Sequence, residues 1–468
     1  MQKSVFWTLY TSLTHTEARK LLEFVNSPFF NTQPELSAAL EYFNECRFYL
    51  KVSPSKENTY KKLYGRGPYQ DQKIRTLLSK LKRLTEQFLV VQNLLREDNE
   101  FQLKLARSLR ERGLHKHFQK EISTHSKKLQ KAELRDARYL RQRFLNRQEN
   151  YQFYSVRRET QQIDMALLIE ELDQAYYAEL LRLACSQISY KAFMDDPKRD
   201  QQMQVALNFI QEKNWIQQPA IGAYYHTFLA LSRPKESEHF LALKDLLFNQ
   251  ADAFSPEELR NLFLLSINYC IKRYNEGNKS YLKEEFLLFK EGFRRNLFMQ
   301  EGYLSPFSFR NSVTLALVLK EYDWVDQFIG QYAPLLPPEQ RENLRTFSLA
   351  RLAFERQEFE KAMDFLRQTD YSDLLLSLAA KSIQIKVYYS LGEEDLLDYH
   401  LKAMRAYIRR KKVMGYHREH YLNLVNFTQK MLDTPTFEKE KRGQLIQQVK
   451  ETRRVAEKAW LLKTLESR

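Results

Sequence analysis

The chain contains 468 residues, of which 43% are hydrophobic and 13% aromatic, whereas glycine and proline contribute only 11 and 13 residues. This composition excludes an intrinsically disordered chain and leaves few turn-forming residues for a many-stranded sheet. The formal net charge of +15 favours acidic partners or docking between parts of the chain, and it says nothing about the fold.

The basic residues are concentrated in two segments. Lys and Arg outnumber Asp and Glu by 16 to 6 in residues 101–160 and by 17 to 7 in residues 401–468. Residues 161–400 instead hold 26 basic and 35 acidic residues. We therefore predict two basic segments and a mildly acidic centre, a distribution that indicates charged partners or docking within the chain.

The sequence predicts a cytoplasmic protein without a membrane partner. Cys46, Cys185 and Cys270 lie far apart, and we expect them to be buried in a reducing compartment. No apolar run approaches the roughly 18 residues that a membrane-spanning helix needs. The first ten residues carry one lysine before an interrupted apolar run, which is unlike a signal peptide.

Residues 1–100 predict a helical N-terminal domain. Thr14 and Glu17 have the spacing of a capping box, so a helix begins there, and Pro28 ends it. A second helix begins after Pro34. A glycine-containing turn at residues 65–68 precedes a long amphipathic helix over residues 71–95.

Part of this domain faintly resembles the winged helix of response-regulator transcription factors. The resemblance rests on residues 63–65 and 74–84, with Leu13, Thr14 and Glu17 upstream. It implies a DNA-reading helix near Lys73, Arg75, Lys80, Lys82 and Arg83. Residues 90–95 continue the helix where that family forms a β-hairpin wing, so a basic, solvated helix face is the favoured interpretation.

Residues 101–195 predict long helices that are first basic and then apolar. Aromatic residues such as Phe144 and Phe153 alternate with Arg135, Arg138, Arg141, Arg143 and Arg147. Arginines contact phosphates and aromatic rings stack on bases, so this patch suits single-stranded nucleic acid or an acidic partner. Packing within the protein explains the aromatic residues without a ligand.

The apolar part, residues 163–193, predicts one helix that should be deeply buried. Its expected inward residues are Leu167, Leu168, Leu172, Tyr176, Leu180 and Leu183. The residues Asp195, Asp196 and Pro197 end it. Helices of hairpin length should follow at about 202–214, 220–231, 236–249, 257–275 and 280–298.

Residues 196–412 contain a repeating pattern. The frames that begin at Tyr322, Phe359 and Glu394 are separated by 37 and 35 residues, and apolar residues recur three and seven positions into each. Residues 349–366 resemble a tetratricopeptide repeat, whose period is about 34 residues. The resemblance implies an all-α, right-handed solenoid of helical hairpins, with Gln357 in place of the motif's glycine.

The basic run Arg409 to Lys412 leads into residues 413–468, which predict polar helices that cap the last repeat. Residues 27–31 and 319–324 also resemble an uncharacterised bacterial family of long all-helical proteins. That resemblance implies a cytoplasmic, repeat-built architecture and supplies no activity.

We find no sequence motif for catalysis, a cofactor or a metal. The chain has no phosphate-binding glycine loop and no nucleophile elbow, and His417 and His420 have no third ligand at metal spacing. The sequence therefore predicts a non-catalytic helical-repeat scaffold that binds a protein or peptide along the inner curve of residues 200–412. The acidic balance of that region favours a basic partner. The alternative is a nucleic-acid-binding protein that uses residues 60–160, and both interpretations leave the oligomeric state open.

Overall fold

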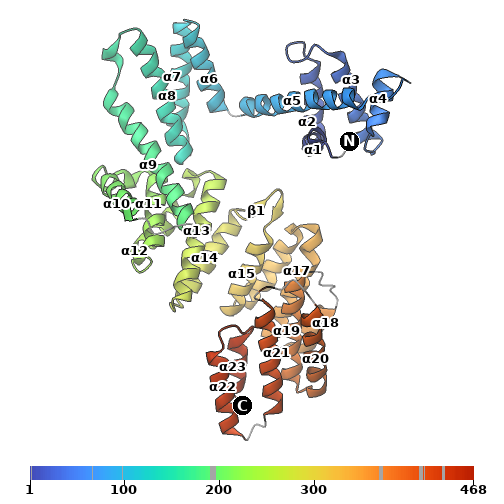
Figure 1. The fold of residues 1–468 in the computed structure, drawn as a ribbon. Coiled ribbons are helices and arrows are strands. Elements are labelled where there is room, and N and C mark those ends of the chain that lie inside the picture. The colour runs from blue at the N-terminus through green and yellow to red at the C-terminus, as the bar shows by residue number, and fades with distance from the viewer. Residues whose placement is uncertain are drawn as a thin grey trace. The chain divides into compact units, whose positions relative to one another are not determined.

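The computed structural model describes residues 1, 3–65, 67–96, 98–189, 197–367, 373–410, 415, 417–434 and 438–467. Apart from one two-stranded hairpin, the regular elements of these residues are all helices (Figure 1). The chain divides into two compact units, residues 1–133 with 137–176 and residues 134–136 with 177–468. The predicted all-α class is confirmed.

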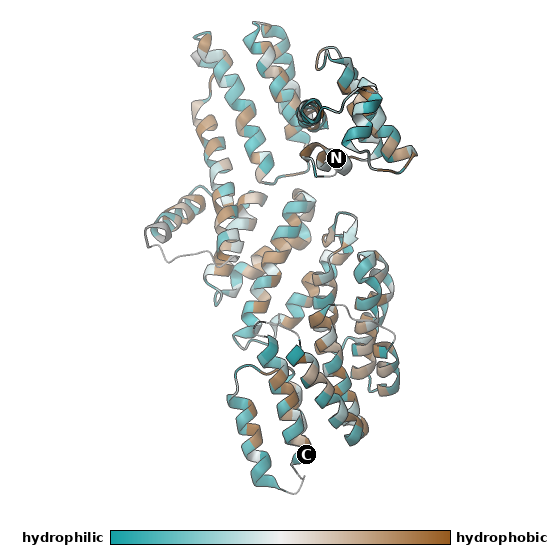
Figure 2. Ribbon diagram, turned by 45° about the vertical axis from the view of Figure 1, so that its right-hand side comes forward, coloured by the Kyte–Doolittle hydropathy of each residue, from teal (hydrophilic) through white to brown (hydrophobic). Residues whose placement is uncertain are grey.

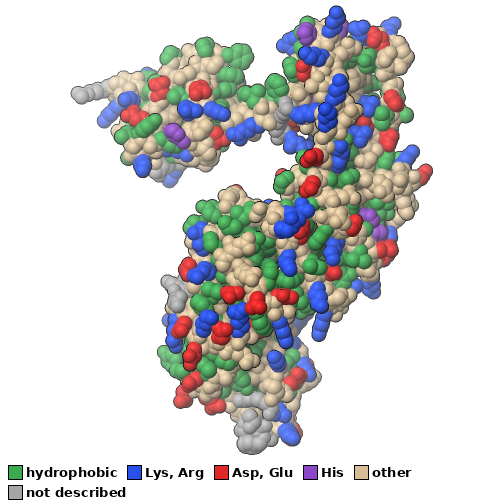
Figure 3. Space-filling model, turned by 180° about the vertical axis from the view of Figure 1, so that it is seen from behind, with side chains coloured by type: hydrophobic (Ala, Val, Ile, Leu, Met, Phe, Trp, Pro, Cys, Tyr) green, Lys and Arg blue, Asp and Glu red, His purple; other side chains and the backbone are tan. Residues whose placement is uncertain are grey.

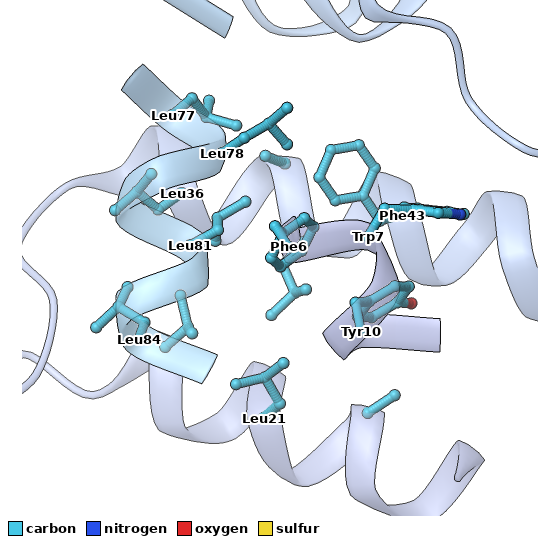
Figure 4. Close-up of a cluster of buried hydrophobic side chains, with 14 of the residues drawn as sticks. Phe6, Trp7, Tyr10, Leu21, Leu36, Phe43, Leu77, Leu78, Leu81 and Leu84 are labelled. Carbon is cyan, nitrogen blue, oxygen red and sulfur yellow. The ribbon is translucent and has the colours of Figure 1, made fainter. Parts of the chain in front are cut away.

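The first unit begins with five helices around one apolar core. Its centre is made by aromatic residues of the first and third helices, including Phe6, Tyr10 and Phe43, and by a stripe of leucines on the fifth helix (Figure 4). Residues i, i+3, i+4 and i+7 of that helix share one face, which explains why the stripe is buried and the remaining face is polar. The helices are α1 (Val5–Ser12), α2 (His15–Asn26), α3 (Pro34–Asn44), α4 (Lys56–Tyr64) and α5 (Asp71–Arg96).

The capping box that begins α2 is present as predicted. The Glu17 amide donates to Thr14 Oγ1 at 3.2 Å, and the Thr14 amide donates to Glu17 Oε2 at 3.0 Å. The hydrogen bond from the Thr14 backbone is also the main cause that lowers the pKa of Glu17. The predicted turn before α5 includes Arg66, which lies outside the described residues.

Four further helices complete the first unit, and the last of them continues into the second. Phe118 on α7 stacks on Phe153 of α8, with 4.6 Å between the ring centroids, and Ile122 and Leu103 pack in the same cluster. The aromatic residue Phe153 therefore has a packing role. The helices are α6 (Asp98–Glu111), α7 (His115–Lys131), α8 (Ala137–Val156) and α9 (Met165–Ser189).

The prediction that the helix now labelled α9 is buried over its apolar face was only partly right: Leu168 is buried, and Leu167 and Leu180 are half-buried. Leu172, Tyr176 and Leu183 are 45%, 56% and 53% exposed. Ala178 and Leu181 are fully buried instead. Apolar residues surround more of this helix than its neighbours cover, so several of them remain exposed. The predicted end of this helix, at residues 193–196, lies outside the described residues.

The second unit consists mainly of helical hairpins followed in chain order (Figure 1). Helices pack within the pairs α11/α12, α13/α14, α15/α16, α17/α18 and α19/α20, and first helices also pack on each other in the pairs α11/α13, α15/α17 and α17/α19. Hydrophobic and hydrophilic residues alternate around these helices (Figure 2), as expected where each hairpin buries one face on its neighbours. The earlier helices are α10 (Pro197–Glu212), α11 (Pro219–Ser232), α12 (Ser237–Asn249), α13 (Pro256–Asn275) and α14 (Tyr281–Arg294).

A short β-hairpin follows α14, where the sequence predicted that the helix would run to residue 298. Asn296 has a left-handed backbone, with φ of 57°, which ends the helix early. Strands β1 (Met299–Gln300) and β2 (Tyr303–Leu304) pair antiparallel. The helices that follow are α15 (Pro306–Val318), α16 (Tyr322–Tyr332), α17 (Pro338–Glu355), α18 (Phe359–Arg367), α19 (Leu374–Leu391), α20 (Glu394–Arg410), α21 (His417–Asp433), α22 (Lys439–Glu451) and α23 (Lys458–Ser467).

The repeat frame found in the sequence coincides with helix starts. Tyr322, Phe359 and Glu394 are the first residues of α16, α18 and α20. The apolar positions assigned to each frame are all at most 3% exposed: Val325, Ile329, Ala362, Leu366, Leu397 and Leu401.

The turns inside these hairpins repeat as well. Lys320, Gln357 and Gly392 each precede the second helix by two residues, and their φ angles are 61°, 63° and 72°. The next amide donates to a carbonyl five residues earlier each time, over 2.9, 2.8 and 3.0 Å. Gln357 thus adopts the left-handed geometry that the motif's glycine would supply.

Candidate protein-binding surfaces

Two of the arginines in the predicted basic patch are held by a buried carboxylate. Arg143 Nη2 lies 2.9 Å from Glu171 Oε1, and Arg147 Nε lies 2.8 Å from Glu171 Oε2. The side chain of Glu171 is only 4% exposed. A carboxylate in this position requires such partners, because an unpaired buried charge is strongly unfavourable. These two guanidinium groups therefore stabilise the packing of α8 on α9.

A second buried glutamate, on α8, repeats this arrangement. Glu149 of α8 accepts hydrogen bonds from Arg107 Nε at 2.7 Å and Arg110 Nε at 3.1 Å. Both arginines lie on α6, and Arg110 also donates to Gln152 Oε1 at 2.6 Å. Four arginines of this basic segment therefore connect α6, α8 and α9 through buried carboxylates.

The other predicted arginines do not form one cluster with this pair. Arg138 and Arg141 are exposed on α8. Arg135 belongs to the other compact unit, where its amide donates to the Ala253 carbonyl at 2.7 Å and its guanidinium donates to the Leu134 carbonyl. Lys and Arg side chains are nevertheless numerous on the face of α6–α8 that Figure 3 shows.

The alternative basic patch lies on the polar side of α5, as the simpler interpretation predicted. Arg75 pairs with Asp71, and Lys82 pairs with Glu86, each within one turn. The other three residues of this patch, Lys73, Lys80 and Arg83, are exposed. Helix α5 continues to Arg96. No β-hairpin wing follows α5, because the strands of the described chain are confined to residues 299–304. Lys73 extends over the Tyr64 ring, Lys80 donates to Gln33 Oε1, and Arg83 makes neither kind of contact within the described residues.

The described residues include free cysteines and one cluster of possible metal ligands. Burial raises the pKa of the Cys185 and Cys270 thiols, so both stay protonated at neutral pH, and all three cysteines are free and buried as predicted. Glu236, Glu238 and His239 could contribute ligand atoms within 4.8 Å of one another. Both carboxylates are exposed at the start of α12, where the helix dipole favours negative charge without any cation.

A hollow of about 690 Å³ opens on the second helices of successive hairpins, along α12, α14 and α16. Trp324, Phe328 and Tyr332 are four residues apart on α16 and therefore share its face. Their rings follow one another with centroids 4.6 and 4.8 Å apart. The hollow is lined in addition by Phe248, Leu287, Phe293 and Leu335, with Gln327 and Gln331 at its surface.

The apolar lining of this hollow is partly open to solvent. Leu287 and Leu335 are 40% and 38% exposed. Its charged residues lie on α14, where Glu291 accepts hydrogen bonds from Arg294 and Arg295 at 2.6 to 2.7 Å. These bonds lower the pKa of Glu291. Lys290 extends over the Phe286 ring, 5.4 Å from its centroid.

A polar ladder runs along the first helices of the hairpins. Thr314, Arg351, Lys386 and Tyr421 lie on α15, α17, α19 and α21, separated by 37, 35 and 35 residues. The first two steps equal those of the repeat frame. Arg351 Nη1 donates to Thr314 Oγ1 at 2.7 Å, which connects the first two members directly.

The chain's C-terminal segment lies against this ladder. Glu457, from the turn before α23, forms an ion pair with Lys386. The Ala456 amide donates to the His420 carbonyl at 3.0 Å, and the Arg454 carbonyl accepts from Asn423 Nδ2 at 2.8 Å. Residues 452–457 are therefore fixed on the faces of α19 and α21.

Neither the hollow nor the occupied ladder was identified from the sequence. The ladder could have been found, since its members stand eight residues before Tyr322, Phe359 and Glu394, the starts of the repeat frame. The hollow could not have been found, because it depends on how closely α14 and α16 pack. The sequence showed no repeat period that aligns these two helices. No protein-family model, curated protein or solved structure matches the chain. Across the described residues, every helix is too short or too polar to cross a membrane.

Proposed function

We propose that this chain is a non-catalytic adaptor of tetratricopeptide-like solenoid architecture, which binds a protein partner through its helical hairpins. The repeated helix starts at Tyr322, Phe359 and Glu394 and the repeated left-handed turns support the architecture. Such arrays present extended surfaces because each hairpin contacts only its neighbours.

The observation that carries the proposal is the aromatic hollow along α12, α14 and α16. Its volume of about 690 Å³ lies within the range of sites that bind ligands in proteins. Interfaces of this kind place aromatic residues at the centre and polar residues at the rim. Gln327 and Gln331, which are exposed and line the same hollow as Trp324, follow that arrangement.

Replacement of Leu287 by Asp tests the proposal. Leu287 is part of the hollow and is substantially exposed, so we expect the variant to fold. Loss of one apolar contact of this size costs about 1.5–3 kcal/mol of binding, which corresponds to a loss of affinity of roughly tenfold to a hundredfold.

The measurement is quantitative co-purification of partner proteins with the wild-type chain and with Leu287→Asp. A matched control is Leu241→Asp, because Leu241 is also exposed, at 55%, but does not line the hollow. A partner lost from Leu287→Asp and retained by Leu241→Asp supports the proposal. Equal recovery with all three proteins contradicts it.

Nucleic-acid binding by residues 60–160 is the competing proposal, and the basic face of α6–α8 favours it (Figure 3). The ion pairs of Arg143 and Arg147 with Glu171 count against the predicted patch. The two proposals differ in salt dependence, because binding to phosphates releases counterions and weakens steeply with salt. Binding of labelled single-stranded DNA or RNA that persists at physiological salt and falls in Arg138→Ala/Arg141→Ala would support the competing proposal.

A further inference from the structure

The ladder on α15, α17, α19 and α21 contains two cations, Arg351 and Lys386. Glu457 forms an ion pair with Lys386. Lys386 is only 13% exposed and pairs with Glu457, and its ammonium group also lies 5.5 Å from the Phe354 ring centroid. A cation so far removed from water needs a carboxylate beside it. Glu457 supplies that carboxylate from a segment that lies on the surface of the hairpins.

Two arginines extend the same electrostatic environment towards α15. Arg351 is influenced by both Glu457 and Arg310. Burial lowers the pKa of Arg351, the neighbouring carboxylates of Glu457 and Glu355 oppose this effect, and Arg310 reinforces it. Arg310 is exposed and forms no ion pair with any residue that the structure describes. The two carboxylates, Glu457 and Glu355, face three cations, Arg310, Arg351 and Lys386, which leaves positive charge on this face.

The same side of α15 also exposes apolar residues. Phe307 and Val318 are 75% and 56% exposed. Phe307 lies one turn before Arg310, and Val318 lies one turn after Thr314, so all four residues share one side of α15. Large apolar side chains beside the exposed Arg310 are suited to a partner that is both apolar and acidic. A basic partner, which the acidic balance of residues 161–400 favoured, does not match these charges.

We propose that this first-helix face binds an acidic peptide segment of a partner protein, and that Glu457 is an internal ligand which the partner's carboxylate displaces from Lys386, beside Arg351. The inference deepens the proposed function, because it assigns partner chemistry to a second surface of the same hairpins. It does not depend on the hollow.

The test is binding of a fluorescein-labelled decapeptide of alternating Glu and Leu to the full-length chain, measured by fluorescence anisotropy. An internal competitor weakens the observed affinity by the fraction of protein that it blocks. We expect Glu457→Gln to bind the probe on the order of tenfold more tightly than the wild type. A decapeptide of alternating Gln and Leu should show no such gain.

A control variant separates the role of Glu457 from a general change in charge. Glu451 is an exposed carboxylate at the end of α22, where it accepts a hydrogen bond from Gln447 of its own helix. Glu451→Gln should bind the probe like the wild type. Arg351→Gln added to Glu457→Gln should remove the gain, and circular dichroism of every variant identifies any that does not fold.

Several results would overturn the inference: equal affinity of wild type and Glu457→Gln, equal binding of the two decapeptides, or a gain that survives Arg351→Gln. A concentration-dependent dimer of Glu457→Gln in light scattering, in place of probe binding, would assign the face to a second copy of the chain and also overturn it. Leu287→Asp should leave probe binding unchanged, so failure here is distinguishable from failure of the hollow.

Discussion

Three turns of the repeat region place different residues in one left-handed conformation. Lys320, Gln357 and Gly392 have φ angles between 61° and 72°. Only glycine adopts this conformation without a steric cost from its side chain, which is about 1–2 kcal/mol for other residues. The sequence showed Gln357 in place of the motif's glycine, and the structure shows that the turn is kept at that cost.

Replacement of Gln357 by Gly should therefore stabilise the protein. We expect a gain of about 0.5–1 kcal/mol, because the relief of strain exceeds the greater flexibility of glycine in the unfolded chain. Gly392→Ala is the matched control and should destabilise by a similar amount. Urea unfolding followed by circular dichroism measures both, and shifts of the two midpoints in the same direction would contradict this explanation.

Glu285 on α14 is a buried carboxyl group whose environment affects stability through pH. Burial raises the pKa of Glu285 from 4.5 to about 7. Between these values the folded state keeps a proton that the unfolded state has lost, so the free energy of unfolding falls as pH rises from about 4.5 to 7 and then levels off.

Glu285→Gln should remove this loss. The variant should exceed the wild type by about 1–3 kcal/mol at pH 8, a range that allows for solvent screening of the group, and should match it near pH 4. Urea midpoints measured at both pH values test the difference. A constant offset between the two proteins across this range would show that Glu285 does not titrate between the folded and unfolded states as described.

At the scale of helices, α8 is held between its neighbours by two buried carboxylates. Glu149 binds arginines of α6, and Glu171 on α9 binds arginines of α8. The sequence predicted helices here and placed Phe153 on the apolar side correctly. It assigned Arg143 and Arg147 to a binding patch because the pattern of one helix does not show which residue of another helix will lie opposite.

Glu171→Gln tests the structural role of these arginines. Removal of the carboxylate leaves two partly buried guanidinium groups without their partner, and we expect a loss of about 3–5 kcal/mol in the stability of the first unit. Glu179→Gln on the same helix is the control, since Glu179 pairs with Arg182 at the surface and should contribute less than about 1 kcal/mol.

Hydrogen exchange of the α8 and α9 amides, read by mass spectrometry, localises the effect to these helices. Faster exchange in Glu171→Gln than in Glu179→Gln supports the structural role. Unchanged exchange in Glu171→Gln, together with stronger binding of single-stranded DNA at physiological salt, would instead return Arg143 and Arg147 to the nucleic-acid interpretation.

Over the whole molecule, local signals were predictable and relations between helices were not. The capping box at Thr14, the extent of α5 and the repeat frame at Tyr322, Phe359 and Glu394 were all readable, because each depends on residues close in the chain. The exposed apolar face of α9 was not, because a hydrophobic pattern shows which residues can be buried and not how much of the helix a neighbour covers.

The same distinction explains the candidate surfaces. The period of 37 and 35 residues was visible in the sequence, and it places Thr314, Arg351 and Lys386 in register on successive first helices. Glu457 stands 71 positions after Lys386. Its return to this ladder depends on how α21, α22 and α23 fold back. The hollow between α14 and α16 likewise arises from packing between hairpins whose sequences do not align.

The most direct test of the account is site-specific photo-crosslinking from the hollow in intact cells that express the full-length chain. A benzophenone amino acid is placed at Gln331, which is exposed at the hollow, and at Gln444, which is exposed on α22 away from it. We predict that position 331 yields a distinct protein adduct that position 444 does not yield and that Leu287→Asp removes. Identical products from the two positions, or an adduct at position 331 that survives Leu287→Asp, would contradict the claim that this chain binds a protein partner through the hollow.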